Sequence, residues 1–141
     1  MKNRMIRALK TVVKKLFKKD KIALTIQAVS NNEIKKINRK YLRKNRVTDV
    51  IAFPYNEEDH SGNYYLGDIV VSYDQAMLYS DRSDKSIMKE FLFLSIHGIL
   101  HFAGYDDKNE RQRQKMIKLQ NHLLSLSSCF FSVILLLASC F

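Results

Sequence analysis

A long apolar segment, from about Ser83 to Phe102, constrains the fold of this chain more than any other feature. Isoleucine, leucine, phenylalanine and methionine occur on nearly every side of a helix drawn through it. A helix that is apolar all round is buried in the core of its protein. The segment therefore predicts a central helix around which the rest of the chain packs.

Two histidines share one face of this predicted helix. His97 and His101 are four residues apart, so their imidazoles lie one above the other. Gly104 then ends the helix, because glycine accepts the left-handed backbone of a helix C-terminus. The turn after it can bring Asp107 back toward the imidazoles. Three protein ligands leave a coordination position open for water, as in catalytic metal sites.

A buried histidine is more often a core residue with a hydrogen-bond partner than a metal ligand, and the HxxxH spacing is common by chance. The context favours the metal. The chain has four histidines, and two of them lie on this one apolar helix. Each buried imidazole needs a partner for its polar nitrogens, and one metal ion would serve both.

The length and composition predict one domain over residues 1–126, followed by an apolar tail at 127–141 of unknown role. One proline and four glycines in 141 residues leave no room for a flexible linker. The only cysteines, Cys129 and Cys140, lie in the tail, so the body has neither a disulfide framework nor thiolate ligands. We expect a reducing, cytoplasmic compartment.

Hydrophobic periodicity places the other elements. Alternating apolar residues and turn signals predict three strands, and 3.6-residue stripes predict helices. Ser30 and Glu33 form a capping-box pattern that starts one of these helices. This mixture predicts an α+β fold. The expected helices are 3–19, one starting at Ser30, 75–80, 83–102 and 108–126, and the expected strands are 22–29, 48–53 (ended by Pro54) and 64–72, with a loop at 56–63.

The formal net charge of +10 points to a polyanionic partner. Basic residues are dense over residues 1–21, where an ordinary solvated, lysine-rich helix face explains them well. A second cluster, between Lys35 and Arg46, contains no acidic residue and is the better candidate for a nucleic-acid surface. Its expected RNA-binding residues are Arg39, Lys40, Arg43, Lys44 and Arg46.

The tail carries no charge from Leu123 to Phe141, a length close to the roughly 20 residues that span a bilayer. Five serines dilute its apolar character. A membrane anchor is therefore the minority interpretation, beside a packed or disordered extension or a sequence end altered by a change of reading frame.

Three blocks of this sequence resemble the YbeY family of metal-dependent endoribonucleases. The family signature HGxLHLxGYDH is matched by HGILHFAGYDD at 97–107. The family blocks TDVLSFP and LGDIVIS are matched by TDVIAFP at 48–54 and LGDIVVS at 66–72, and Glu90 falls at a family glutamate. The resemblance covers roughly residues 20–126 and excludes the tail.

This resemblance implies a single domain with a mixed sheet of about four strands around the central helix. It implies one zinc ion per chain, held by His97, His101 and Asp107, and no small-molecule cofactor. It also implies single-strand-specific cleavage of RNA in maturation of the small-subunit ribosomal RNA 3′ end and in ribosome quality control. The expected partners are ribosomal RNA and the small ribosomal subunit.

Two positions depart from the family pattern. Most members have histidine where this chain has Asp107, and two histidines with one carboxylate also suit iron(II) or another divalent metal. Asp106 is a rival ligand, although the spacing favours Asp107. Many members have an arginine where this chain has Leu42, and Arg43 or Arg46 is the nearest substitute.

The expected chemistry is hydrolysis of an RNA phosphodiester at the metal. Gly98 stands where a zincin protease would carry its catalytic glutamate, so peptide hydrolysis by that route is unsupported. Asp49, Asp68 and Glu90 are candidates for orienting the ligands through hydrogen bonds, although ordinary structural roles explain them equally well. Two alternatives stay open: a ribosome assembly factor with a structural metal, and a metal-dependent hydrolase of another phosphate ester.

Overall fold

The computed structural model describes residues 2–138, with side chains described from residue 3 to residue 126. Five helices and three strands occur in this part of the chain, so the α+β class is confirmed. In chain order the elements are α1 (Lys2–Leu16), β1 (Ile22–Val29), α2 (Asn31–Leu42), β2 (Val50–Glu58), β3 (Tyr64–Ser72), α3 (Tyr73–Tyr79), α4 (Asp84–Phe102) and α5 (Glu110–Ala138).

Local sequence signals explain several of these boundaries. The capping box forms at the start of α2: the Ser30 hydroxyl accepts a hydrogen bond from the Glu33 backbone N–H, and the Glu33 carboxylate accepts one from the Ser30 N–H. The Ser83 side chain caps α4 in a similar way by accepting from the Ser86 N–H. Such caps satisfy backbone donors that a helix leaves unpaired at its first turn.

The sheet is mixed, in the order β1-β3-β2. β1 runs parallel to β3, and β2 runs antiparallel to it. The described residues contain three strands, one fewer than the resemblance implies. These three strands correspond to the three segments in which apolar residues alternate along the sequence.

The expected end of the second strand at Phe53 is wrong. β2 continues through Pro54 to Glu58, and its register with β3 shifts between Pro54 and Glu57. Asn56 adopts a left-handed backbone with φ 55° at this irregularity. Proline is tolerated in a sheet on an edge strand or at a bulge, where its missing N–H breaks no ladder. β2 meets both conditions.

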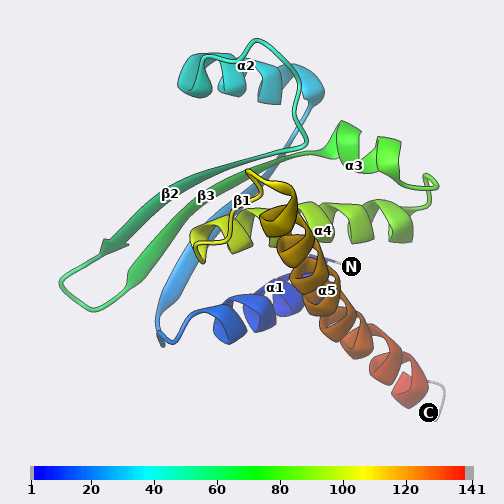
Figure 1. Cartoon of the computed structure of the whole chain (residues 1–141). Coiled ribbons are helices and arrows are strands. Elements are labelled where there is room, and N and C mark those ends of the chain that lie inside the picture. Colours follow the sequence, from blue (N-terminus) through cyan, green and yellow to red (C-terminus); the bar gives the residue numbers. More distant parts are fainter. Residues whose placement is uncertain (1, 139–141) are drawn as a thin grey trace.

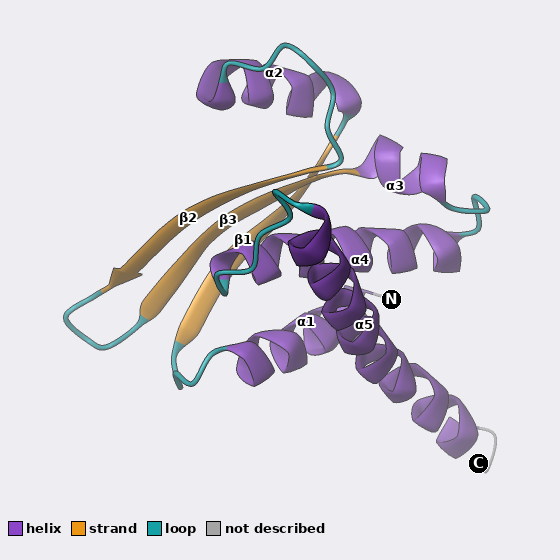
Figure 2. Ribbon diagram, viewed as in Figure 1, coloured by secondary structure: helices purple, strands orange, loops and turns teal. Residues whose placement is uncertain are grey.

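Helices cover both faces of the sheet (Figure 1). On one face, Ile34 and Ile37 of α2 pack against Val29, Ile51 and Val70 of the strands. The larger core lies on the other face, where α4 packs against the sheet and α1 packs against α4. α5 crosses over both α1 and α4 (Figure 2). The sheet is thus the middle of three layers.

α4 lies very close to the middle strand, β3. A Cβ atom added at Gly98 would lie only 2.9–3.1 Å from side-chain atoms of Ile69. Because Gly98 has no side chain, the helix backbone settles onto the strand. This contact sets the distance between the sheet and the C-terminal half of α4, and so the position of the two histidines.

The last helix does not end at 126, as expected, but continues to Ala138. The disappearance of charge after residue 122 suggests a boundary, yet the segment 127–138 contains neither glycine nor proline to break a helix. The side chains of the tail at 127–141 lie outside the described residues. Among the helices as described, none is long and apolar enough to cross a bilayer.

Candidate metal centre

The end of α4 brings the three predicted residues together. Gly104 takes a left-handed backbone, with φ 85°, as predicted. The Tyr105 N–H then donates to the Leu100 carbonyl and closes the helix end. This tight reversal sends the following residues back along the helix, so that Asp107 reaches the level of His97.

The ligand atoms of His97, His101 and Asp107 all lie within 4.8 Å of one another. The two Nε2 atoms are 3.1 Å apart, and the Asp107 Oδ2 atom is 3.8 Å from the His97 Nε2 atom. Two nitrogens bound to one tetrahedral zinc at about 2.0–2.1 Å are separated by roughly 3.3 Å. The separation of the imidazoles therefore fits a shared ion.

Each imidazole is oriented by a hydrogen bond at its other nitrogen. The Nδ1 atom of His101 lies 3.1 Å from the Tyr105 carbonyl oxygen. The Nδ1 atom of His97 lies 3.4 Å from the Oε1 atom of Gln120 on α5, and the Gln120 amide Nε2 donates to the Phe93 carbonyl at 2.9 Å. Partners of this kind commonly orient metal-bound histidines.

These partners determine which nitrogen carries the proton. The carbonyl oxygens of Tyr105 and Gln120 can only accept, so each Nδ1 atom must donate its N–H. Neutral His97 and His101 then present bare lone pairs at Nε2, aimed at each other across 3.1 Å. Two acceptors at this distance repel unless a proton or a cation lies between them. The donor set thus fits a divalent metal ion.

The surroundings of His97 disfavour a proton there. Burial lowers the pKa of His97 below its ordinary value, and the neighbouring His101 lowers it further. The buried neutral imidazole is the form that binds a metal. Only 24% of the His97 side chain is exposed, compared with 45% of Asp107, so the site opens to solvent on the carboxylate side.

The two adjacent aspartates, Asp106 and Asp107, have different partners. The Asp106 carboxylate forms an ion pair with the Lys108 ammonium at 2.7 Å and accepts a hydrogen bond from the Asp107 N–H. The hydrogen bond from Lys108 lowers the pKa of Asp106. Asp107, in contrast, faces His97. Asp107 is therefore the carboxylate that completes the cluster.

A cavity of about 310 Å³ lies beside the cluster. It is lined by His97 and Asp107, and also by Asp49, directly before β2, and Arg113 on α5. Asp49 accepts a hydrogen bond from the Val50 N–H at 2.9 Å, which fixes its carboxylate at the strand end. The cavity therefore joins the expected metal ligands to one carboxylate and one guanidinium.

The other two residues expected to orient ligands lie elsewhere. Asp68 on β3 accepts a hydrogen bond from the Tyr65 hydroxyl. Glu90 is half-buried on α4, seven residues before His97, which places it about 10 Å away along the helix axis. The structure brings Asp49 to the cluster but does not bring Asp68 or Glu90 there.

The basic cluster lies on the outer side of α2 and in the loop that follows. All five expected RNA-binding residues are exposed, and so is Leu42. The buried Asn38 holds this loop: its side-chain amide donates to the Arg46 carbonyl at 2.9 Å, and its own backbone carbonyl accepts from the Lys44 N–H. The five residues are Arg39, Lys40, Arg43, Lys44 and Arg46.

Sequence reasoning missed Gln120, Arg113 and Asn38. A signal existed for Gln120, which occupies a position on the apolar stripe of α5 between Met116 and Leu123 and is almost fully buried. Asn38 interrupts the buried side of α2 in the same manner. No local pattern marks Arg113, which is one of many charged residues on an exposed helix face.

The chain is similar to curated proteins called Endoribonuclease YbeY. It is 37% identical to one from Prochlorococcus marinus over 78% of this chain and 63% of that protein. It is 38% identical to another from Oceanobacillus iheyensis over 72% of this chain and 71% of the relative. The chain thus spans less than two thirds of the length of the Prochlorococcus relative.

A solved structure agrees with the fold. The solution structure of a Thermotoga maritima protein superposes with a TM-score of 0.62 at 27% identity, covering 93% of this chain and 83% of the other. The family model described as "Endoribonuclease YbeY" matches residues 1–127, which include the helix end, the turn and all three clustered residues. This chain belongs to the YbeY family.

Proposed function

We propose that this chain is a metal-dependent endoribonuclease that cleaves single-stranded RNA, with a zinc ion held by His97, His101 and Asp107. One observation carries the proposal: two imidazoles, each fixed at Nδ1 by a carbonyl acceptor, aim their Nε2 lone pairs at one point beside a carboxylate. The name of the curated relatives supplies the reaction class.

The cavity residues have roles that their chemistry suggests. A divalent ion bound there would activate a water and polarise a phosphoryl oxygen. Arg113 offers a guanidinium fork for a phosphodiester oxygen. Asp49 is the residue that we retain for keeping the cluster in orientation, since it lines the same cavity as His97 and Asp107.

The basic loop supplies a path for the RNA backbone. Arg46 is three residues before Asp49, so their Cα atoms are at most about 11 Å apart. A single-stranded RNA that binds these basic residues would therefore extend to the cavity. The residues are Arg39, Lys40, Arg43, Lys44 and Arg46. Arg43 or Arg46 would hold the phosphate that the family arginine, replaced here by Leu42, holds elsewhere.

The substrate we propose is the 3′ end of the small-subunit ribosomal RNA, bound in the cytoplasm on the small ribosomal subunit, with a further role in ribosome quality control. The resemblance of the three sequence blocks supports this assignment. Zinc is the proposed metal, although the carboxylate of Asp107 makes iron(II) or another divalent ion a chemically reasonable occupant.

The test combines metal analysis with RNA cleavage on the purified chain. Asp107→Ala should lower metal affinity by more than about 100-fold, because loss of outer hydrogen-bond partners alone costs 10–100-fold. Cleavage of a single-stranded oligonucleotide should be lost with it, while Asp107→His should retain both. Asp106→Ala is the matched control, since that carboxylate bonds Lys108. Full metal content and activity in Asp107→Ala would refute the ligand assignment.

Two further measurements separate the alternatives. If His97→Ala abolishes folding together with metal binding, the metal is structural. This result would support the alternative of a ribosome assembly factor. If the variant folds, as circular dichroism would show, but does not cleave RNA, catalysis is supported. A wild-type chain that hydrolyses small phosphate esters but leaves single-stranded RNA intact would indicate a different hydrolase.

A further inference from the structure

Four aromatic side chains form a row on the face of the sheet that carries α2. The Tyr41 ring of α2 meets the Phe53 ring of β2 edge to face, with the ring centroids 5.5 Å apart. Tyr55 follows Phe53 by two residues, so it points to the same side of β2 about 7 Å further on. Its ring stacks on that of Tyr65 in β3, with the centroids 5.8 Å apart. This aromatic row runs from α2 toward the end of the β2–β3 hairpin.

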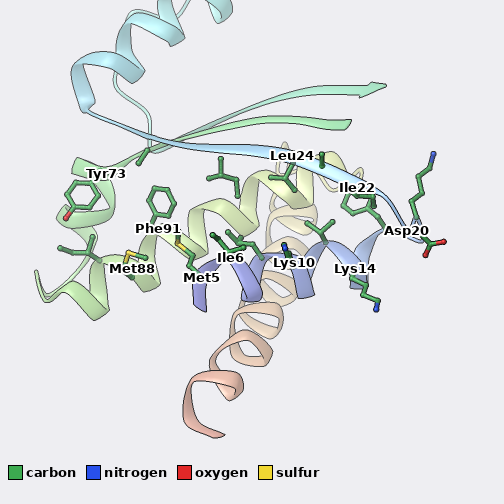
Figure 3. A pocket seen from close by; sticks show the side chains of 18 of the residues that line it. Met5, Ile6, Lys10, Lys14, Asp20, Ile22, Leu24, Tyr73, Met88 and Phe91 are labelled. Atoms are coloured by element: carbon green, nitrogen blue, oxygen red, sulfur yellow. The ribbon is translucent and has the colours of Figure 1, made fainter. Parts of the chain in front are cut away.

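The opposite face of the sheet is occupied by helices. Figure 3 shows Ile22 and Leu24 of β1 pointing toward α1 and α4, where they line a cavity of about 1080 Å³. Side chains alternate along a strand, so Thr25 points to the other face, where its hydroxyl lies 2.7 Å from the Tyr65 hydroxyl. The aromatic row is therefore on the α2 side of the sheet. The hairpin end extends beyond α2 (Figure 1).

The rings of this row are accessible and held in place. Tyr41 is 59% exposed and Tyr55 is 51% exposed. The Tyr65 hydroxyl donates to the Asp68 carboxylate and accepts from the Thr25 hydroxyl, because an ionised carboxylate can only accept. Tyr65 is thus anchored beneath Tyr55. Aromatic pairs on neighbouring strands stabilise a sheet, but that role alone does not require rings with half of their surface open to solvent.

Positive charge borders the row at its α2 end. The Lys40 Nζ atom lies 5.0 Å from the centroid of the Tyr41 ring, and the exposed Arg43 follows two residues later. No ion pair within the described part of the chain engages either cation. A second copy of this chain, with a net charge of +10, would be repelled. The phosphates of a nucleic acid would be attracted.

The hairpin end of the row is acidic. Glu57 lies opposite Tyr65 in the pairing of β2 with β3, and Asp68 accepts the hydrogen bond of Tyr65. These carboxylates repel phosphates. The phosphates of a bound strand therefore lie toward α2, and the uncharged bases contact the rings.

We propose that the aromatic row stacks on the bases of single-stranded RNA and anchors the substrate outside the metal cluster. This inference rests on the proposed endoribonuclease function. Aromatic rings accept unpaired bases of any sequence, because every base has a π face, whereas the bases of a double helix are stacked on one another. Phe53 follows Asp49 by four residues, about 13 Å along the strand. RNA anchored on the row thus reaches the cavity beside His97.

The probe is a fluorescent single-stranded oligonucleotide of 2′-O-methyl ribonucleotides, whose intact length a gel confirms after each measurement. The comparison is the same backbone without bases. In fluorescence anisotropy, the wild-type chain should bind the oligonucleotide with bases at least about fivefold more tightly, which is the lower range for stacking of one base. Equal affinity for the two, or no binding of the oligonucleotide with bases, would overturn the proposal.

Matched variants locate the stacking. Tyr55→Ala should weaken binding about fivefold or more, and so should Tyr41→Ala on the other element, with circular dichroism confirming that both fold. Tyr55→Phe keeps the ring and should bind as the wild type does. Tyr79→Ala is the control, because Tyr79 is 56% exposed on α3 and outside the row. Wild-type affinity in both Tyr55→Ala and Tyr41→Ala would refute the inference.

The salt dependence distinguishes stacking from charge. Arg43→Ala should lower the slope of log affinity against log salt by about 0.7, because it removes one phosphate contact of a single strand. Tyr55→Ala should weaken binding at every salt concentration with the slope unchanged. A lower slope in Tyr55→Ala, equal to that of Arg43→Ala, would show that the loss is electrostatic and would contradict stacking.

These outcomes are separate from those that test the proposed function. Anisotropy requires neither cleavage nor a bound metal ion, so an inactive chain can still show stacking. In a chain that cleaves RNA, Tyr55→Ala should raise KM, and an unchanged KM would refute the aromatic row alone. Self-association of the wild type that Tyr55→Ala abolishes would show that a second copy occupies the row, and would also refute it.

Discussion

The metal cluster depends on atoms that would never touch the ion. The Nδ1 hydrogen bonds of His97 and His101 fix the imidazole tautomers before any metal arrives. One acceptor is a backbone carbonyl, which no side-chain substitution removes. The other is the side chain of Gln120, held in turn by the Phe93 carbonyl. Gln120 is therefore the position where this preorganisation can be altered by mutation.

We expect Gln120→Leu to lower metal affinity by about 10–100-fold, the usual cost of losing a hydrogen-bond partner of a ligand. Gln120→Glu should lower the affinity less than Gln120→Leu, because a carboxylate also accepts from an imidazole N–H but loses the amide hydrogen bond to the Phe93 carbonyl. Competition with a fluorescent chelator measures both. Gln114→Leu is the control on the same helix, since Gln114 bonds only the exposed Glu110. Unchanged affinity in Gln120→Leu would contradict the orienting role.

At the scale of residues, the sequence predicts what depends on short-range geometry. Helical spacing and a glycine stop are enough to group His97, His101 and Asp107. Gln120 approaches His97 from 23 residues away, across the contact between α4 and α5. Periodicity within one helix carries no information about such a contact. Arg113 escapes prediction for the same reason.

At the scale of elements, two local arrangements control the positions of the functional segments. The capping box starts α2, the helix that carries the basic cluster. The close contact between Gly98 and Ile69 seats α4 on the sheet. Each arrangement joins two named residues, so each can be tested by mutation.

The capping box should make stability depend on acid pH. Hydrogen bonds from the backbone and side chain of Ser30 lower the pKa of Glu33 below its ordinary value of 4.5. The ionised carboxylate thus stabilises the fold above that pH, and the contribution is lost as the pH falls through the lowered pKa. Thermal unfolding should show Glu33→Ala less stable than wild type at about pH 7, with the difference shrinking as the pH falls through the lowered pKa. Asn32→Ala serves as a control without this pH dependence.

Gly98→Ala should destabilise the chain although alanine favours helices. The gain in helix propensity is about 1 kcal/mol, whereas forcing a methyl group into a packed core costs about 1–3 kcal/mol. Ile69 is fully buried and branched at Cβ, so it cannot move aside. In an Ile69→Ala background the same change should become stabilising. Denaturant unfolding of the four chains measures this coupling, and additive effects would argue against the contact.

Strand and helix types follow from periodicity, but two element ends do not. Pro54 predicts a strand end because proline breaks a central ladder. A strand lies at an edge because of the order of strands in the sheet. The residues of that strand alone do not determine this order. Likewise, α5 continues beyond residue 126. The absence of charged residues changes the surface of a helix but does not interrupt its backbone hydrogen bonds.

At the scale of the whole molecule, positive charge is present on both sides of the sheet. One set lies on α2 and its following loop, and the other lies on α1. A total of +10 attracts any polyanion. The position of each set, and not the total, therefore decides which partner each face binds.

The salt dependence of RNA binding should distinguish the two sets. For a single-stranded ligand, removing one cation that binds a phosphate lowers the slope of log affinity against log salt by about 0.7. Lys44→Ala combined with Arg46→Ala should thus lower it by about 1.4. Lys10→Ala combined with Lys14→Ala, on α1, should leave the slope unchanged. Equal slopes for the wild type and both double variants would show that the RNA does not bind at Lys44 and Arg46.

The proline in β2 has a consequence for association of the sheet. At the β2 border, Pro54 lacks an N–H and Asn56 adopts a left-handed backbone at a shift in register. A strand of another molecule that approached this border would find an interrupted row of hydrogen-bonding groups. The β2 border is thereby protected against the edge-to-edge pairing that leads to fibres.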